Sequence, residues 1–230
     1  MNALVGIGVY TPAEAERLVD VPAGKITRWL RGHSVQGQDY APLWMPQVDI
    51  GDGRVYLGFR DLMEVRVADA WIAKGISAIR VRAAIELARE VYGLERPLST
   101  DAFKTNGRDI FMKVTERDSD GVERERLLNT FRKQYVFSSI MEPLLRNIDF
   151  DASGVPEIWW PKGRNGQIVV DPKRSFGQPI DAVSSVPTAI LAAAAKLQGI
   201  DLAAKAYDVP ASSVRRAVKF ESGRETRLAA

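Results

Sequence analysis

The chain has no cysteine and a single histidine, His33, among its 230 residues. Disulfide bonds and thiolate metal sites are therefore excluded, and so is any cluster of histidine ligands. A Cys-His catalytic pair is excluded for the same reason. His33 follows the end of a predicted helix, and we assign it no role.

Long apolar runs are missing as well. No segment approaches the roughly 18 consecutive apolar residues that a membrane-spanning helix needs. The N-terminus lacks a basic region followed by an apolar run, which would indicate a secretory signal. We therefore expect a cytoplasmic protein that does not contact membranes.

The chain also lacks a strong charge of one sign. Lys and Arg number 32 and Asp and Glu number 29, which leaves a net charge of only +3. Overall charge therefore does not indicate nucleic acid, and only a local cluster could. Hydrophobic residues at 46% and charged residues at 27% are typical of a soluble globular protein, and the length allows more than one small domain.

The stretch TPAEAERLVDVPAGKITRWLRG, residues 11–32, predicts two short helices joined by a tight turn. Thr11 and Glu14 have the spacing of a capping box, and Ile26 and Trp29 lie on the inward face of the second helix. The outward face is basic. This is the pattern of a helix-turn-helix, whose second helix enters the DNA major groove. The alternative is a helical hairpin with a solvated basic face.

A hairpin is predicted after this unit. The polar residues 33–42 read as a loop, and then Leu43–Met45 and Arg54–Leu57 flank Asp52-Gly53, a strong hairpin turn. Such a hairpin would be a wing, with Arg54 on the phosphate backbone. It could equally be an ordinary ribbon that covers the helices.

Two further helices complete the first predicted domain, residues 1–96. One runs from Phe59 to a C-cap at Gly75, and the next begins at Ser77 and ends at Gly93. The outer face of the second helix mixes arginines with glutamates, which is typical of a solvated helix.

Residues 97–172 predict a middle region with a small sheet. Asn106-Gly107 favours a hairpin, residues 116–124 read as a charged turn, and ERLLN suggests another strand. A helix is predicted over 133–147, kinked or ended by Pro143. Strands are predicted over 155–160 and 167–170, and core packing is the default for Trp159 and Trp160.

Residues 173–230 predict a helical C-terminal domain. Ser185 is the expected cap of an Ala-rich helix that ends at Gly199, and a short helix and a longer basic one follow. Together they form a second helix-turn-helix-like unit. The shape of this unit alone does not show whether it binds DNA or has only a structural role. The predicted fold class is thus mainly α with small β elements (α+β).

The order of elements through Gly75-Ile76-Ser77 resembles the winged-helix domain of MerR-type regulators. The string LGFRDLMEVRVADAWIAKGIS, preceded by TRWLRG, is similar to a narrower group, the VapB-type antitoxins. The segments DPKRSFGQPI and VPTAILAAAAKLQGIDLAAKAYDVPASSVRRAVKFE resemble the small C-terminal domain of those antitoxins. In one place the chain differs: residues 181–184 stand where Gly-Thr-Arg is common in shorter relatives, so a contact made by that Arg is not carried over.

The resemblance implies that the partner is a PIN-domain ribonuclease toxin of a type II toxin–antitoxin system, with a cluster of carboxylates that bind magnesium. An Arg or Lys inserted among those carboxylates would block catalysis, because a guanidinium pairs bidentately with a carboxylate. The candidates for this contact are Arg215, Arg216, Lys219, Arg224 and Arg227. The alternative is a solvated face with a frayed tail.

The predicted contacts with double-stranded operator DNA are Lys25, Thr27, Arg28, Arg31 and Arg54. One recognition helix makes few phosphate contacts, so we expect a homodimer on a palindromic operator. The leading hypothesis is an antitoxin that represses its own operon and neutralises the toxin. The second is a MerR-like regulator in which residues 97–230 sense a ligand or another protein. We predict no catalytic residues, cofactor or metal, and no enzyme activity.

Overall fold

The computed structural model describes residues 6–115 and 135–228, and the side chains of Val35 and of residues 224–228 are left aside. Helices predominate and the sheets are small and antiparallel, so the predicted α+β class is confirmed. No helix in the described ranges is both long and apolar enough to cross a membrane.

Helices α1 (Pro12–Val19) and α2 (Ala23–Arg31) form the predicted pair. The capping box is confirmed: the Glu14 amide donates to Thr11 Oγ1 at 3.2 Å and the Thr11 amide donates to Glu14 Oε2 at 2.8 Å. Asp20 ends α1 in the left-handed conformation, with φ of 63°. Ile26 and Trp29, the predicted inward residues of α2, are buried, and Leu30 is buried beside them.

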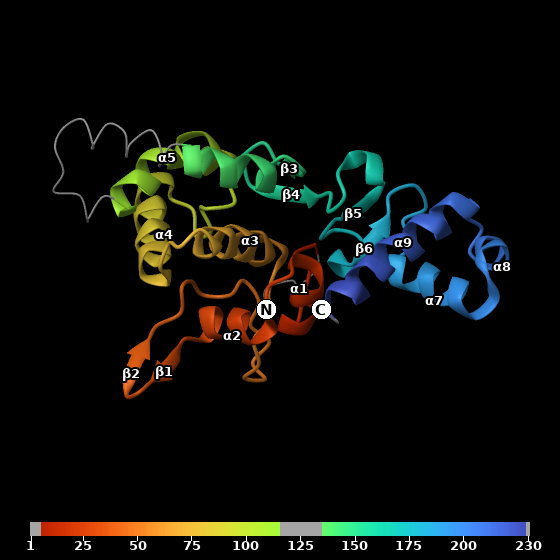
Figure 1. Ribbon diagram of the computed structural model, residues 1–230, viewed down its shortest axis with the longest axis horizontal. Coiled ribbons are helices and arrows are strands. Elements are labelled where there is room, and N and C mark those ends of the chain that lie inside the picture. The colour runs from red at the N-terminus through yellow and green to blue at the C-terminus, as the bar shows by residue number, and fades with distance from the viewer. Residues whose placement is uncertain (1–5, 116–134, 229–230) are drawn as a thin grey trace.

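The hairpin that follows α2 is not where the sequence analysis placed it. Residues 33–40, predicted as a loop, form the strands β1 (His33–Val35) and β2 (Gln38–Tyr40). Their turn consists of Gln36 and Gly37, both with positive φ, which matches the right-handed strand twist. The hairpin projects from the body beyond α2 (Figure 1).

The prediction of a hairpin across Asp52-Gly53 is wrong. Residues 43–57 form only single bridges, Val48 to Tyr56 and Tyr10 to Leu57. Two prolines border the first predicted strand, and proline cannot donate to a strand ladder. Arg54 therefore lies on an irregular loop rather than on a wing.

Helix α3 (Phe59–Ala73) lies at the centre of the N-terminal half, and α4 (Ala78–Tyr92) packs beside it (Figure 1). Trp71 is fully buried, and its ring centroid lies 4.9 Å from that of Phe111 and 5.8 Å from that of Phe103. The Ser77 cap and the left-handed Gly93 stop of α4 are both confirmed.

Helix α5 (Asp101–Thr115) replaces the hairpin predicted at Asn106-Gly107. Phe103, Ile110 and Phe111 recur at helical spacing and are all buried against the core. That apolar face overrides the local turn preference of the Asn-Gly pair. The charged turn and the strand predicted over ERLLN lie outside the described residues.

A helix over residues 135–145 follows, and it continues two residues past Pro143. It leads into an antiparallel four-stranded sheet whose spatial order follows the chain. The strands are β3 (Ile148–Phe150), β4 (Pro156–Trp159), β5 (Ile168–Val170) and β6 (Pro179–Asp181). β4 and β5 match the predicted strands, and single 3-10 turns precede β5 (Arg164–Gly166) and β6 (Ser175–Gly177).

The C-terminal helices are α7 (Thr188–Gln198), α8 (Ile200–Ala206) and α9 (Ala211–Leu228), at the opposite end of the molecule from the β1–β2 hairpin (Figure 1). Pro187, not Ser185, precedes the first turn of α7. Ser185 instead adopts a positive φ in a turn where its amide donates to the carbonyl of Asp181.

Two hydrophobic clusters stabilise the described parts of the chain. The larger one contains buried residues from Tyr10 through Val170 and so crosses residue 96, the predicted first boundary. The smaller one lies between Leu191 and Ala217. The Tyr10 hydroxyl connects the two halves by donating to the carbonyl of Gly177 at 2.8 Å. A Cβ on Gly177 would lie 2.2 Å from this hydroxyl, so only glycine fits.

A buried carboxyl in α3 predicts a pH dependence of stability. Burial raises the pKa of Glu64 to about 7, although the amides of Leu98 and Ser99 donate to its two oxygens at 3.0 Å and oppose the shift. Because the pKa is higher in the folded chain, this stabilisation is full below the unfolded value of 4.5 and is lost as pH rises through 7.

We expect the difference in unfolding free energy between wild type and Glu64→Gln to change by about 3 kcal/mol between pH 4.5 and 7.5. The wild type should lose stability relative to the variant as pH rises. Urea unfolding at several pH values measures this difference, and titrations shared by the two proteins cancel in it. Parallel pH profiles would show that Glu64 does not titrate in this range.

Candidate nucleic-acid interface

The tight turn between α1 and α2 sets the orientation of the basic helix. Left-handed Asp20 stops α1, and Pro22 restarts the chain before the first turn of α2. Glu16 on α1 accepts a hydrogen bond from the amide of Ala23 at 3.2 Å, which satisfies one N–H of the new helix. With Ile26 and Trp29 anchored in the core, the opposite face of α2 points outward.

Two of the predicted contacts on α2 are engaged within the protein. Lys25 Nζ lies 2.7 Å from Asp69 Oδ1 and 5.0 Å from the centroid of the Trp29 ring. The hydroxyl of Thr27 donates to the carbonyl of Ala23 at 2.8 Å. Lys25 therefore connects α2 to α3 and would have to exchange partners to reach a ligand, whereas the Thr27 hydroxyl is engaged within α2.

Arg28 is the most available cation of α2. Its side chain is exposed, and it forms no hydrogen bond or ion pair with the described residues. Arg31 is also exposed, but its guanidinium donates to the carbonyl of Gly53. That bond connects the end of α2 to the loop that carries Arg54.

Arg54 is 80% exposed, and its nearest acid is Asp52, with Nε 4.0 Å from Oδ2. The Arg54 amide donates to Asp52 and lowers the pKa of that carboxyl, helped by the hydroxyl of Tyr56. The loop is thus held by local bonds, while the Arg54 guanidinium remains in solvent beside the end of α2.

A hollow of about 630 Å³ adjoins the basic face of α2. Lys25 and Arg28 line it from α2, His33 and Tyr40 from the hairpin, and Arg82 from α4. The rings of His33 and Tyr40 stack at 5.1 Å. His33 Nδ1 and Arg82 Nε are buried without a hydrogen-bond partner in the described structure. The hollow therefore adds two nitrogen-bearing side chains to the cations of α2.

Neither His33 nor Arg82 was predicted as a site residue. The mixture of arginines and glutamates on the outer face of α4 favoured a solvated position for Arg82, and His33 was assigned no role. Arg82 reaches back to donate to the carbonyl of Ala41, 41 residues away. The periodic pattern of one helix does not reveal a contact with a residue 41 positions away.

Some cations of the basic C-terminal helix α9 are exposed to solvent, and one is paired within the protein. Arg215 and Lys219 are exposed on α9. The expectation that Arg216 faces outward is wrong, because its Nη2 lies 2.7 Å from Oδ1 of Asp181, a carboxylate with no exposed surface. The side chains of Arg224 and Arg227 lie outside the described residues.

Asp181 occupies the position where the resemblance showed a departure. Burial opposes its ionisation, but hydrogen bonds from Arg216 and from the amide of Ser184 hold its pKa below the ordinary value. The pair ties α9 to β6. Arg216 therefore has an intramolecular role, and Arg215 and Lys219 are the cations that α9 presents to solvent in its described part.

Comparisons with known proteins agree with part of the resemblance. No protein-family model matches the chain. It is 27% identical over 196 residues to a Mycobacterium tuberculosis protein named "Putative antitoxin VapB45", covering 80% of each chain. It is 29% identical over 115 residues to the uncharacterized protein Rv2308 of the same organism, over 45% of this chain and 44% of the other. The chain is thus similar to a VapB antitoxin over most of its length.

One solved structure has a related fold. The crystal structure of Rv2018 from Mycobacterium tuberculosis superposes with a TM-score of 0.67, over 91% of this chain and 96% of the other. The two chains share 21% of their residues, so this comparison supports the fold alone.

Proposed function

We propose that the chain is an antitoxin that binds and neutralises a PIN-domain ribonuclease toxin and binds its own operator as a symmetric dimer. The observation that carries the antitoxin role is the similarity to VapB45 over 80% of both chains. The toxin partner is inferred from that name and from the motifs of the sequence.

The operator-binding part of the proposal rests on α2. Its apolar face is buried, and Arg28 stands on the opposite face without an internal partner among the described residues. The hairpin β1–β2 directly follows α2 and would serve as the wing, and the loop that carries Arg54 is bonded to the end of α2 through Arg31. A helix that presents Arg28 and Arg31 on its exposed face suits the negative surface of a DNA groove.

The toxin-binding part rests on α9. Arg215 and Lys219 are exposed there, whereas Arg216 is engaged by Asp181. Cations one helical turn apart can approach a cluster of carboxylates together. A guanidinium placed among the metal-binding carboxylates of the toxin would neutralise them.

Toxin inhibition tests this assignment. The first step is to find whether a gene beside this one encodes a short PIN-type protein, as the proposal predicts. The chain is then co-expressed with that protein, and complex formation and RNA cleavage are measured. We expect Arg215→Glu with Lys219→Glu to weaken the complex about tenfold or more, because each reversal turns an attraction into a repulsion. The matched control, Lys196→Glu with Lys205→Glu, makes the same charge change on exposed lysines of α7 and α8 and should leave affinity within about twofold.

Unchanged inhibition by the Arg215/Lys219 variant would remove α9 from the interface. Failure of the wild-type chain to bind the neighbouring PIN-type protein would contradict the antitoxin role itself. Operator binding without toxin binding would instead support a MerR-like regulator.

A further inference from the structure

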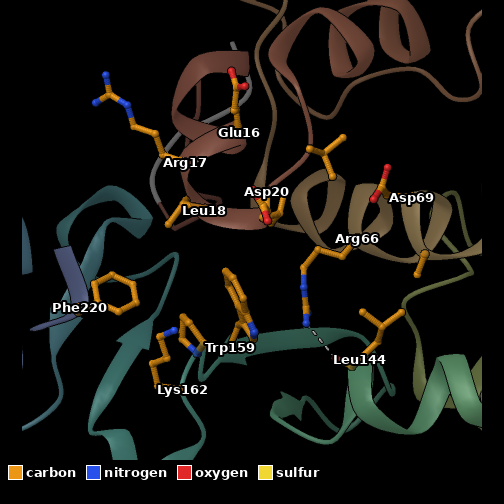
Figure 2. A pocket seen from close by; sticks show the side chains of 14 residues that line it. Glu16, Arg17, Leu18, Asp20, Arg66, Asp69, Leu144, Trp159, Lys162 and Phe220 are labelled. Carbon is orange, nitrogen blue, oxygen red and sulfur yellow. Dashed lines mark hydrogen bonds between the residues drawn. The ribbon is translucent and has the colours of Figure 1, made fainter. Parts of the chain in front are cut away.

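A pocket of about 300 Å³ lies where the end of α1, α3, the helix over 135–145, the end of β4 and α9 meet (Figure 2). Its apolar lining comes from Leu18, Val19, Leu144, Trp159 and Phe220. Segments from both ends of the chain thus enclose one space, and its volume is at the lower end of the range for small-molecule sites.

Arg66 is the charged group that distinguishes this pocket. Its Nη2 donates to the carbonyl of Leu144 at 3.1 Å, its Nη1 approaches Met63 Sδ at 3.5 Å, and its guanidinium lies 4.5 Å from the centroid of the Trp159 ring. All three contacts are with neutral groups. No carboxylate of the described residues forms an ion pair with Arg66.

This environment is costly for a cation. Burial lowers the pKa of Arg66 to about 10, and no carboxylate offsets the shift. A guanidinium carries five N–H donors in a planar fork, and the contacts described above use only part of that capacity. Arg66 is partly buried and lines the pocket with neutral partners only. Because charges removed from water are normally paired, an anion in the pocket would stabilise this guanidinium.

The other charged residues of the pocket limit what that anion can be. Arg17 and Lys162 also line it, and each already has an interaction of its own. Glu16 accepts the Ala23 amide and Asp69 accepts Lys25, so both are engaged. Asp20 is exposed at the rim. In Figure 2 the Arg66 side chain extends toward Leu144 and away from Asp69. The pair with Lys25 neutralises Asp69. Because the two remaining acids offset Arg17 and Lys162, the pocket presents about one net positive charge, that of Arg66. One positive charge matches a singly charged acid better than a dianion such as a phosphate monoester.

We propose that this pocket binds a small monocarboxylate with an apolar or aromatic body. The carboxylate pairs with the fork of Arg66, and the body packs against Leu18, Val19 and Phe220. The exposed cations Arg28 of α2 and Arg215 and Lys219 of α9 do not line this pocket. It is therefore distinct from the surfaces proposed for DNA and toxin.

The test uses three aromatic acids as probes, benzoate, phenylacetate and indole-3-acetate, each beside its neutral amide. Binding to the full chain is followed by NMR titration. We expect at least one acid to bind at least tenfold more tightly than its amide, because a charge-assisted bidentate pair is lost in the amide. Arg66→Met should abolish this preference. Arg60→Met, on the same helix but outside the pocket, should keep it.

Arg66→Lys guards against a folding defect, since it keeps the charge but loses the bidentate fork; it should fold like wild type and retain a reduced preference. Equal affinity for acids and amides, or no saturable binding of any acid below about 10 mM, would overturn the proposal. Retention of the preference in a folded Arg66→Met variant would do so as well.

Discussion

Replacing Asp61 by alanine is expected to lower the free energy of unfolding by about 4 kcal/mol. Asp61 has no exposed surface, and its two oxygens accept from the Trp44 indole at 3.1 Å, the Gln47 amide at 2.7 Å and the Gly58 amide at 2.9 Å. The guanidinium of Arg96 also donates to it. One carboxylate therefore caps α3, holds the loop before it and pairs with the segment after α4.

The large effect follows from what the substitution leaves behind. Alanine would leave a buried indole N–H, two amides and a largely buried guanidinium without an acceptor. Each of these donors costs free energy when it is unpaired. The matched control is Asp109→Ala on α5, whose carboxylate is 88% exposed and lies 3.9 Å from Arg108; it should change stability by less than about 0.5 kcal/mol. Urea unfolding measures both. A loss below about 1 kcal/mol for Asp61→Ala would show that these bonds are not needed for the fold.

The second large effect concerns DNA. We expect Arg28→Ala to weaken operator binding by about 10- to 100-fold, since one side chain that contacts a base or phosphate contributes about 1–3 kcal/mol. Stability should stay within about 0.5 kcal/mol of wild type, because Arg28 is exposed and has no partner in the described structure. Fluorescence anisotropy on a labelled promoter duplex gives the affinity.

Arg108→Ala is the matched control for that experiment. Arg108 is about half exposed on α5, which lies across α3 from α2 (Figure 1). Its loss removes the same charge at a distance from the proposed interface and should leave affinity within about twofold. Equal losses for the two variants would mean that α2 is not the recognition helix.

Local patterns predicted the first two helices well. The capping box at Thr11, the turn at Asp20 and the buried Trp29 each depend on neighbours within a few residues, which the sequence displays directly. The same reasoning failed at α5, because the Asn106-Gly107 turn preference is worth less than the burial of Phe103 and Phe111. Local turn chemistry decides only where no larger apolar face competes with it.

The candidate sites depended more on distant contacts. Lys25 and Asp69 are 44 residues apart, and Arg216 and Asp181 are 35 apart. A sequence pattern shows the charge of such residues but not their partners. The cations of α2 and α9 therefore looked equivalent in the sequence, although Lys25 and Arg216 are paired within the protein and Arg28 has no partner among the described residues. Arg66 drew no attention for the same reason, because its pocket forms only when α1, β4 and α9 come together.

The most direct test of the proposed function is a salt titration of the wild-type chain on the promoter of its own operon, beside a scrambled duplex of equal length. We predict tighter binding to the promoter, with the logarithm of affinity falling by roughly 0.9 per phosphate contact for each decade of salt. Equal affinity for the two duplexes at low ionic strength would contradict operator recognition by α2.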